Sequence, residues 1–463
     1  MKKTILIIVS SLCCSVLAYN QSLDIQTIEK IRAEYKTFAG DDIAIRNALS
    51  NNDIKSVALN RDVCGKTDNN FKYRVKVSGI TDQKSSGRCW MFTGLNSLRP
   101  MIIESANLSG FEFSTNYLFF WDMLEKSNLF LEATIQNANK DISDKTVEWL
   151  FKNPIGDGGV WNSFANIITK YGVVPKTVMP ETYHSENTSW LNRILSRKLR
   201  EYGLKLRELR NSKATDIQVS QEKFKMISEI YRLLVLFLGE PPVEFSYRFV
   251  DKDKNIGEFV TYTPLDFLKQ MFPEYDKNDY VMLMNDPSRE YYKVYEIEYD
   301  RNVLEGQNWR FLNLPADEIK TFALNSIKNN EAMYASCDVG KQLNKDDGTL
   351  DINNYDFESL LGTKFGMNKA ERIKTFDSGS THAMLLIACD TDDSDKPVKW
   401  QFENSWGASY GQNGYLTFTD DWFDNYMFRL VINKKFIDEK TLKLLDQKAI
   451  MLPPWDPMFM ADN

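Results

Sequence analysis

The spacing of apolar residues predicts helices in the middle of the chain. Between residues 191 and 211 the apolar positions recur mostly at steps of three and four, which is the spacing of one helical face: Leu191, Ile194, Leu195, Leu199, Tyr202, Leu206 and Leu209. A second helix is expected from about 219 to 238, because Gly239-Glu240-Pro241 follows it. Residues 24–60 also have a helical pattern.

The pattern changes toward the C-terminus. Two strand-like runs, 243–250 and 258–262, flank a turn at 251–255. After about residue 380 four apolar runs of strand length follow one another, at 382–389, 399–404, 414–419 and 427–432. Residues 72–186 instead alternate aromatic-rich helical pieces with glycine turns. Helices are therefore expected first along the chain and strands later.

Composition excludes several classes of function. The 463 residues carry a net charge of −7, which disfavours general nucleic-acid binding. The chain has two histidines, so a metal site built from several imidazoles is excluded, and we expect no metal and no cofactor. The segment 191–213 holds eight Lys or Arg against two Glu. An anion-binding patch would explain this, but a solvated helix face or a subunit contact is favoured.

Residues 1–18 have the pattern of a signal peptide. Lys2 and Lys3 precede a short apolar run, and Val16 and Ala18 are small residues before a cleavage point. A buried N-terminal helix is the alternative. From the signal-peptide pattern we expect export to the periplasm or beyond, with no membrane span in the mature chain. Cleavage would leave four cysteines, whose pairing the sequence does not fix: Cys64, Cys89, Cys337 and Cys389.

Cys89 is the strongest candidate nucleophile. It follows a loop of small residues, Ser85-Ser86-Gly87-Arg88, and opens an apolar run expected to form a helix that stops near Arg99-Pro100. A cysteine at a helix N-terminus is stabilised as thiolate, the reactive form. Gln83 lies six residues earlier and could donate its amide to an oxyanion, together with the Cys89 N–H. The alternative is a buried apolar cysteine.

His382 and Asn404 can complete the site. His382 opens an apolar strand, and Asn404 follows 22 residues later in Glu403-Asn404-Ser405-Trp406-Gly407. The Asn404 side chain can accept a hydrogen bond from the imidazole and orient it, while Trp406 shields that bond from water. Cys, His and Asn together form a thiol triad of nucleophile, base and orienting group. His184, between acidic residues, is interpreted as a surface histidine on a loop.

These segments resemble the papain-like cysteine peptidases, and more narrowly the bleomycin hydrolase and aminopeptidase C branch. The separation of Cys89 from His382 is 293 residues, against about 130–150 in papain, so a large insertion is required. Further matching stretches cover essentially the whole mature chain: 57–61, 117–122, 157–159, 170–176, 337–341, 367–372 and 455–458.

The resemblance implies an α+β, papain-like fold with a large helical insertion, in which a helical subdomain faces a strand-rich one. The expected parts after the signal peptide are an N-terminal arm (19–71), the helical subdomain (72–186), a helical hook with connecting strands (187–330), the strand-rich subdomain (331–450) and a C-terminal arm (451–463). The hook would serve assembly into a hexameric ring, and the arm would lie in the active-site cleft.

The resemblance also implies roles for individual residues. Cys89 would be the nucleophile, His382 the base and then the acid, Asn404 the orienting residue and Gln83 the oxyanion donor. Substrate would contact Gly158, Gly159 and Trp406, and the carboxylate of Asn463 would hold the free amine of a peptide. The expected activity is that of a cysteine aminopeptidase.

One departure concerns the arm. It ends in Phe459-Met460-Ala461-Asp462-Asn463, bulkier and more acidic than the branch usually is. An endopeptidase or acyl transferase with an open cleft is therefore an alternative. A catalytically inactive ring that binds peptides is another.

Overall fold

A computed structural model describes residues 23–38 and 42–459, and the chain divides into two compact units. The first unit comprises residues 1–59 and 356–363, and the second comprises 60–355 and 364–463. The predicted signal peptide lies outside the described residues. The first unit is helical where it is described, in agreement with the sequence pattern, and α13 packs on α3. Its helices are α1 (Ile25–Phe38), α2 (Asp42–Asn51), α3 (Ile54–Ala58) and α13 (Phe357–Leu361).

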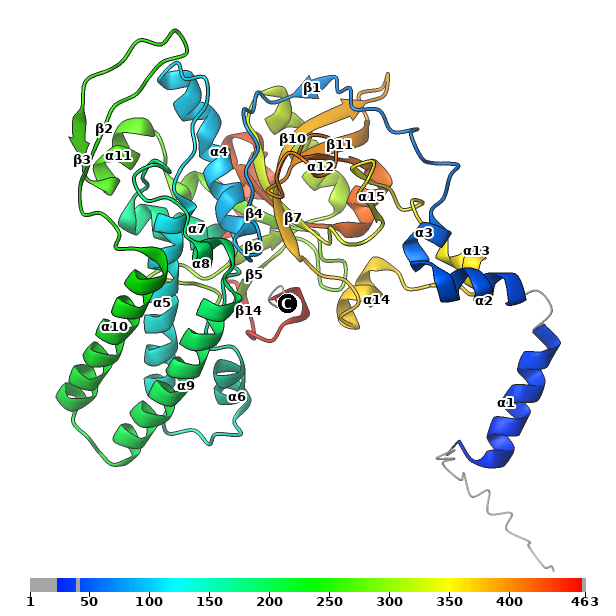
Figure 1. The fold of residues 1–463 in the computed structure, drawn as a ribbon, viewed down its shortest axis with the longest axis horizontal. Coiled ribbons are helices and arrows are strands. Elements are labelled where there is room, and N and C mark those ends of the chain that lie inside the picture. The colour runs from blue at the N-terminus through cyan, green and yellow to red at the C-terminus, as the bar shows by residue number, and fades with distance from the viewer. Residues whose placement is uncertain (1–22, 39–41, 460–463) are drawn as a thin grey trace, which may run out of the picture. The chain divides into compact units, whose positions relative to one another are not determined.

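A large mixed sheet forms the centre of the second unit (Figure 1). Eleven of its strands follow the order β14-β5-β6-β4-β13-β7-β10-β11-β12-β9-β8, and β1 also pairs with β10. Most neighbours are antiparallel. The strands are β1 (Tyr73–Arg74), β4 (Tyr280–Met284), β5 (Lys293–Ile297), β6 (Arg310–Asn313), β7 (Met333–Cys337), β8 (Leu343–Asn344), β9 (Thr349–Leu350), β10 (His382–Thr391), β11 (Pro397–Glu403), β12 (Tyr415–Thr419), β13 (Met427–Asn433) and β14 (Ile450–Leu452).

The four strands predicted after residue 380 are present as β10, β11, β12 and β13. The two runs predicted around the turn at 251–255 form a separate hairpin. Its strands, β2 (Phe245–Tyr247) and β3 (Val260–Tyr262), are shorter than predicted, and they pair antiparallel.

Helices surround the sheet in the second unit. They are α4 (Cys89–Ser105), α5 (Thr115–Gln136), α6 (Lys145–Lys152), α7 (Trp161–Tyr171), α8 (Tyr183–Glu186), α9 (Ser189–Asn211), α10 (Asp216–Leu238), α11 (Pro264–Met271), α12 (Ala316–Lys328), α14 (Lys369–Lys374), α15 (Asp420–Tyr426) and α16 (Glu439–Lys443). Short 3-10 turns occur at η1 (Lys277–Asp279), η2 (Lys434–Phe436), η3 (Leu444–Asp446) and η4 (Pro457–Phe459). In the described residues, no helix combines the length and apolarity that a membrane crossing needs.

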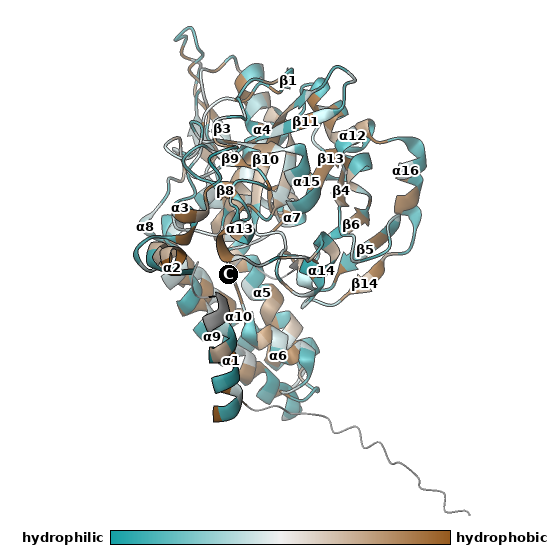
Figure 2. Ribbon diagram, turned by 90° about the vertical axis from the view of Figure 1, so that its right-hand side faces the viewer, coloured by the Kyte–Doolittle hydropathy of each residue, from teal (hydrophilic) through white to brown (hydrophobic). Residues whose placement is uncertain are grey.

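The predicted helices at 191–211 and 219–238 form an antiparallel pair, α9 and α10, that packs on α5 (Figures 1 and 2). Leucines of the predicted stripe are fully buried, at 191, 195, 199 and 206. Ile194 instead lies at the rim and is 37% exposed. Thr215 and Gln218 cap each other at the start of α10, and Gly239 ends it with φ of 86°.

The helix of Cys89 is longer than predicted. We expected it to stop near Arg99-Pro100, but α4 continues to Ser105 with Pro100 inside it. A proline inside a helix removes one hydrogen bond. Here the turn beyond it is retained by packing, because Ile102 is fully buried and Arg99 is held in a buried polar cluster.

Candidate active site

Cys89 is the first residue of α4 and is 4% exposed. The helix packs against β7 and β10, and Cys89 belongs to the same apolar cluster as Ala383 of β10. The strand β10 begins at His382. The fold therefore packs the helix that begins at Cys89 against the strand that begins at the predicted base.

His382 makes the hydrogen bond that the sequence led us to expect. Its Nε2 lies 2.8 Å from Oδ1 of Asn404, and both side chains are buried. The ring of Trp406 stacks on the imidazole at 4.6 Å between centroids, which covers this bond. With Asn404 Oδ1 as acceptor, Nε2 carries the proton, and Nδ1 is the nitrogen that can exchange a proton with a thiol.

The environment of His382 favours the neutral imidazole. Burial lowers the pKa of His382 to about 4, while the hydrogen bond with Asn404 acts in the opposite direction. A neutral imidazole is the form that can accept a proton from Cys89. The roles of Cys89, His382 and Asn404 stay predictions, and their placement is compatible with them.

Gln83 is tied to the residue that follows Asn404. Its backbone N–H donates to the Ser405 carbonyl at 2.8 Å, and its side-chain Oε1 accepts from the Ser405 hydroxyl at 2.7 Å. Its Nε2 donates to the carbonyl of Ser86 at 2.6 Å. An amide nitrogen carries two protons, so the second can serve the predicted oxyanion. Hydrogen bonds and a ring contact between distant segments thus bring Gln83, His382, Asn404 and Trp406 together.

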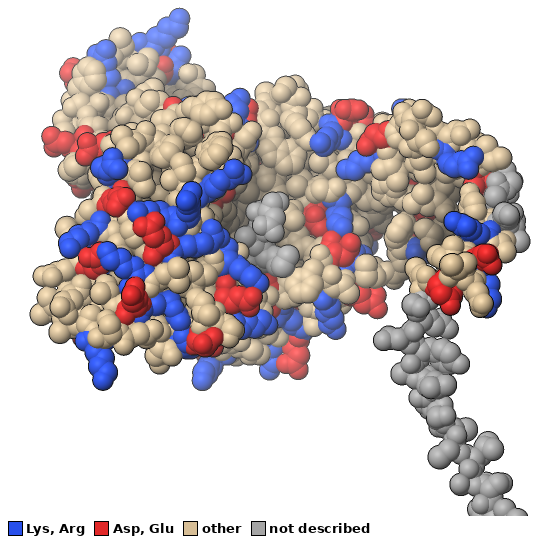
Figure 3. Space-filling view, turned by 60° about the horizontal axis from the view of Figure 1, so that its bottom comes forward, with Lys and Arg blue, Asp and Glu red and all other residues tan. Residues whose placement is uncertain are grey.

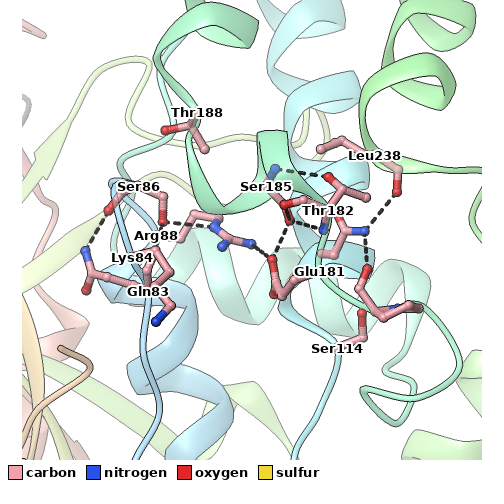
Figure 4. A network of polar contacts seen from close by, with 12 residues as sticks. Gln83, Lys84, Ser86, Arg88, Ser114, Glu181, Thr182, Ser185, Thr188 and Leu238 are labelled. Atoms are coloured by element: carbon pink, nitrogen blue, oxygen red, sulfur yellow. Dashed lines mark hydrogen bonds and ion pairs between the residues drawn. The ribbon is translucent and has the colours of Figure 1, made fainter. Parts of the chain in front are cut away.

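A buried ion pair holds the loop before Cys89 (Figure 4). The Arg88 guanidinium is fully buried, lies 2.8 Å from Oε2 of Glu181, and also donates to the Ser86 hydroxyl. Ser185 donates to the same Glu181 oxygen at 2.5 Å. Sequence analysis gave Arg88 no role. A charged residue directly before a buried helix was the available signal, since a buried charge requires a partner.

The segment Asp157-Gly158-Gly159 is fastened to the same loop. The Asp157 carboxylate accepts from the Gly87 N–H at 2.7 Å, and its carbonyl accepts from the Trp90 indole at 2.8 Å. A Cβ on Gly159 would lie 2.7 Å from the Trp90 ring, so only glycine fits there. A Cβ on Gly158 would meet no atom within 4 Å.

Lys126 of α5 supports this segment from the other side. Its ammonium donates to the carbonyls of Gly156 and Gly158, at 3.0 and 2.6 Å, and pairs with Asp122 at 2.7 Å. Neither Lys126 nor Asp157 was given a role of its own from the sequence, because the loop groups that they contact lie 30 or more residues away. Substrate contacts of Gly158, Gly159 and Trp406 stay predictions, and Asn463 lies outside the described residues.

We had expected His184 to lie on a loop, but it does not. It lies in the short helix α8, is partly buried, and packs edge-on against Phe237 with centroids 4.7 Å apart. The turn forms here because Thr182 and Ser185 cap each other.

Several basic side chains of α9 bind groups on neighbouring segments of the protein. Arg207 donates to the Asn137 carbonyl and Arg200 to the Phe151 carbonyl, both at 2.8 Å, while Lys205 pairs with Glu222. Figure 3 shows Lys and Arg interspersed with Asp and Glu over the lower part of the molecule in Figure 1, where α6, α9 and α10 lie. Mixed charge of this kind is typical of a solvated helix face.

The described residues contain no group of three or more His, Cys, Asp or Glu arranged to hold a metal ion. Within the same part of the chain, Cys64, Cys89, Cys337 and Cys389 form no disulfide with one another.

Comparison with known proteins identifies the family. The model of the Peptidase C1-like family matches residues 22–459. Human bleomycin hydrolase is 39% identical over 442 residues, covering 93% of this chain and 97% of the relative. Aminopeptidase C of Lactobacillus delbrueckii subsp. lactis is 37% identical over 444 residues, covering 95% and 98%. The crystal structure of PepW from Lactobacillus rhamnosis HN001 superposes with a TM-score of 0.90 at 36% identity, covering 94% and 98%.

The match extends over the described fold, including the helices α9 and α10 and the sheet, at identities well above those at which only the fold is shared. The resemblance drawn from the sequence motifs is confirmed, as are the α+β, papain-like architecture and the expectation of a cysteine peptidase. The chain belongs to the Peptidase C1-like family.

Proposed function

We propose that this protein is a cysteine aminopeptidase that removes N-terminal residues from peptides. The observation that carries the proposal is the buried His382–Asn404 hydrogen bond of 2.8 Å, on a strand packed against the helix that begins at Cys89. The relatives named aminopeptidase C and bleomycin hydrolase support the same reaction class.

The chemistry follows from the arrangement. His382 accepts the Cys89 proton, and the thiolate attacks the carbonyl carbon of the first peptide bond. The resulting oxyanion accepts hydrogen bonds from the Gln83 amide and the Cys89 N–H. His382 then protonates the leaving amine, which gives an acyl-enzyme and a shortened peptide. Water, deprotonated by His382, hydrolyses the thioester and restores Cys89.

Restriction to free N-termini is attributed to the C-terminal arm. We propose that the terminal carboxylate of Asn463 pairs with the substrate ammonium and that Asp462 adds negative charge beside it. An acetylated peptide has no ammonium and would lose this ion pair. The course of the arm supports the proposal, because its last described turn, η4, lies close to the segment that leads into His382, with the Pro457 carbonyl 3.6 Å from where a Cβ of Gly379 would be.

Assembly and export are further parts of the proposal. Large apolar side chains are exposed on α10 and around β2 and β3, among them Ile217, Phe224, Val243 and Phe259, each at least 64% exposed. Such a surface favours self-association, and the expected number of six subunits comes from the resemblance to the bleomycin hydrolase branch. Light scattering on the mature protein measures the subunit number. Cell fractionation with N-terminal sequencing tests cleavage after Ala18 and export to the periplasm or beyond.

One peptide in two forms tests the activity. The reduced mature protein is incubated with the peptide bearing a free or an acetylated N-terminus, beside a Cys89→Ala control. Stepwise release of residues from the free form alone is the expected result. Cleavage of both forms, lost in the control, would indicate an open-cleft endopeptidase. Cleavage of neither would overturn the peptidase proposal in favour of a ring that only binds peptides.

A further inference from the structure

Asp456 is held at the base of η4 by an ion pair in which one nitrogen of Arg289, Nη2, contacts both carboxylate oxygens. The Arg289 guanidinium donates to both carboxylate oxygens of Asp456, at 2.6 and 2.8 Å, and the side chains are 16% and 6% exposed. Nε of Arg289 pairs with the buried Asp286 at 2.6 Å. Asp456 also accepts the Met458 N–H at 3.1 Å, so the same carboxylate fixes the following turn. Charge-assisted hydrogen bonds of this kind are stronger than neutral ones, so they hold the turn in place.

A second arginine holds the next residue. Arg429 of β13 donates to the Met458 carbonyl, and its guanidinium stacks on Trp309 at 3.9 Å from the ring centroid. The Met458 side chain is 1% exposed and belongs to an apolar cluster with Val160, which directly follows Gly159. The chain just before the last residues is therefore anchored by charge on one side and by apolar packing on the other.

The anchored turn lies within reach of the catalytic histidine. Pro457 approaches Gly379, which is three residues before His382 and so at most about 11 Å from it along the chain. The four residues after Phe459 span at most about 14 Å when extended. If the turn η4 were displaced by a few ångströms, the terminal carboxylate would therefore no longer be placed to pair with a substrate amine.

We propose that the Arg289–Asp456 ion pair, supported by Arg429, is the positioning element that sets how far the arm extends over the cleft, and hence the preference for free N-termini. This inference rests on the proposed function of the arm. Arg289 and Asp456 touch no reacting atom in this proposal. They act through the arm, so their loss should change the choice between substrates more than the chemical step itself.

The test is the ratio of kcat/KM for a free peptide to that for its acetylated form, measured in the Asp456→Asn variant. Asparagine retains an oxygen for the Met458 N–H, and Arg289 retains Asp286, so the variant is expected to fold. Loss of one charged contact predicts a fall in the ratio of about tenfold or more. We expect the KM for the free peptide to rise while kcat for the acetylated peptide is retained or increases. Arg289→Lys keeps the charge but offers one nitrogen in place of the Nη2 and Nε that contact Asp456 and Asp286, so it should give an intermediate ratio.

A matched control is Glu132→Gln, which breaks the ion pair with Lys223 between α5 and α10. Those side chains are similarly shielded, at 25% and 21% exposed, but lie outside the arm. The ratio should not change in this variant. An equal loss in control and test variants would show general destabilisation and overturn the inference.

A variant that lacks residues 460–463 tests the role of the arm separately from the role of the Arg289–Asp456 ion pair. If this truncation leaves the ratio unchanged, the proposed role of the arm fails, whatever Asp456→Asn does. If the truncation lowers the ratio and Asp456→Asn does not, the arm keeps its role and the ion pair is refuted as its positioning element.

Discussion

The ion pair between Arg99 and Glu403 joins the helix of Cys89 to the strand that ends beside Asn404. Nη2 of Arg99 lies 2.5 Å from Oε1 of Glu403, and the side chains are 2% and 0% exposed. Arg99 also donates to the Gly79 carbonyl at 2.9 Å and to Asn96 at 3.1 Å. We predict that substitution of Glu403 lowers the unfolding free energy much more than substitution of Arg99 does.

The asymmetry follows from which partner can become neutral. Glu403→Gln keeps the shape of the side chain but leaves the Arg99 guanidinium buried without a counter-charge. Arginine does not deprotonate in proteins, so a loss of about 3–5 kcal/mol in unfolding free energy is expected. Arg99→Met leaves a carboxyl group that can take up a proton. Burial already raises the pKa of Glu403 to about 7 against the opposing effect of Arg99. The cost should then be about 1–3 kcal/mol, that of unsatisfied buried groups.

The loss of unfolding free energy caused by Arg99→Met should depend on pH. The pKa of Glu403 is higher in the folded than in the unfolded chain, so the folded state binds the extra proton. Stability therefore falls as pH rises from the unfolded value toward the folded one. The variant should be closer to wild type at pH 5 than at pH 8. The Arg99→Met/Glu403→Gln double variant should lose less than the sum of the single losses.

Urea unfolding, followed by tryptophan fluorescence, measures the unfolding free energy of the wild type, the two single variants and the double variant. The control is Glu148→Gln, which breaks the exposed pair between Glu148 and Lys152 at 2.7 Å and should leave the midpoint nearly unchanged. Equal losses in the two single variants, or strict additivity in the double variant, would refute the reasoning that an uncompensated buried guanidinium dominates.

The remaining predictions concern the reaction. Cys89→Ala should abolish turnover while circular dichroism shows an intact fold, and retained turnover would sink the mechanism. His382→Ala should lose activity in the same peptide assay, whereas His184→Ala should keep it. Gly159→Ala should lower kcat/KM strongly, because its Cβ would lie 2.7 Å from the Trp90 ring, while Gly158→Ala meets no neighbour and should not disturb the fold. Because burial lowers the pKa of His382 to about 4, protonation should inactivate the base only near that pH. A half-maximal kcat/KM at pH 6.5 on the acid side would contradict this.

Local patterns predicted the elements that depend on local periodicity. The helix α9 was predicted because seven apolar positions repeat at helical steps, and β10 to β13 because apolar runs of strand length are separated by turns. The end of α4 was predicted wrongly, because a proline penalty is local whereas the burial of Ile102 that offsets it is tertiary.

The candidate site was predictable only in part, for the same reason. Cys89, His382 and Asn404 have distinctive side chains in distinctive surroundings, so each could be picked out alone. Arg88 and Glu181, 93 residues apart, are ordinary charged residues until the fold brings them together. Spacing along the chain contains no information about such pairs, since they depend on the order of strands and the packing of helices.

The contacts between distant segments suggest how stability and reactivity are linked in this molecule. The two halves of the site meet through Gln83 with Ser405, at 2.7 Å, and through Arg99 with Glu403, at 2.5 Å. Ser405 and Glu403 flank Asn404, so both contacts act on the residue expected to orient His382. A variant that weakens either contact should therefore lose orientation of the imidazole before the sheet itself unfolds. Catalytic activity would then respond to weakened contacts between α4 and β11 more strongly than the unfolding free energy does. Catalysis depends on sub-ångström placement that global stability does not require.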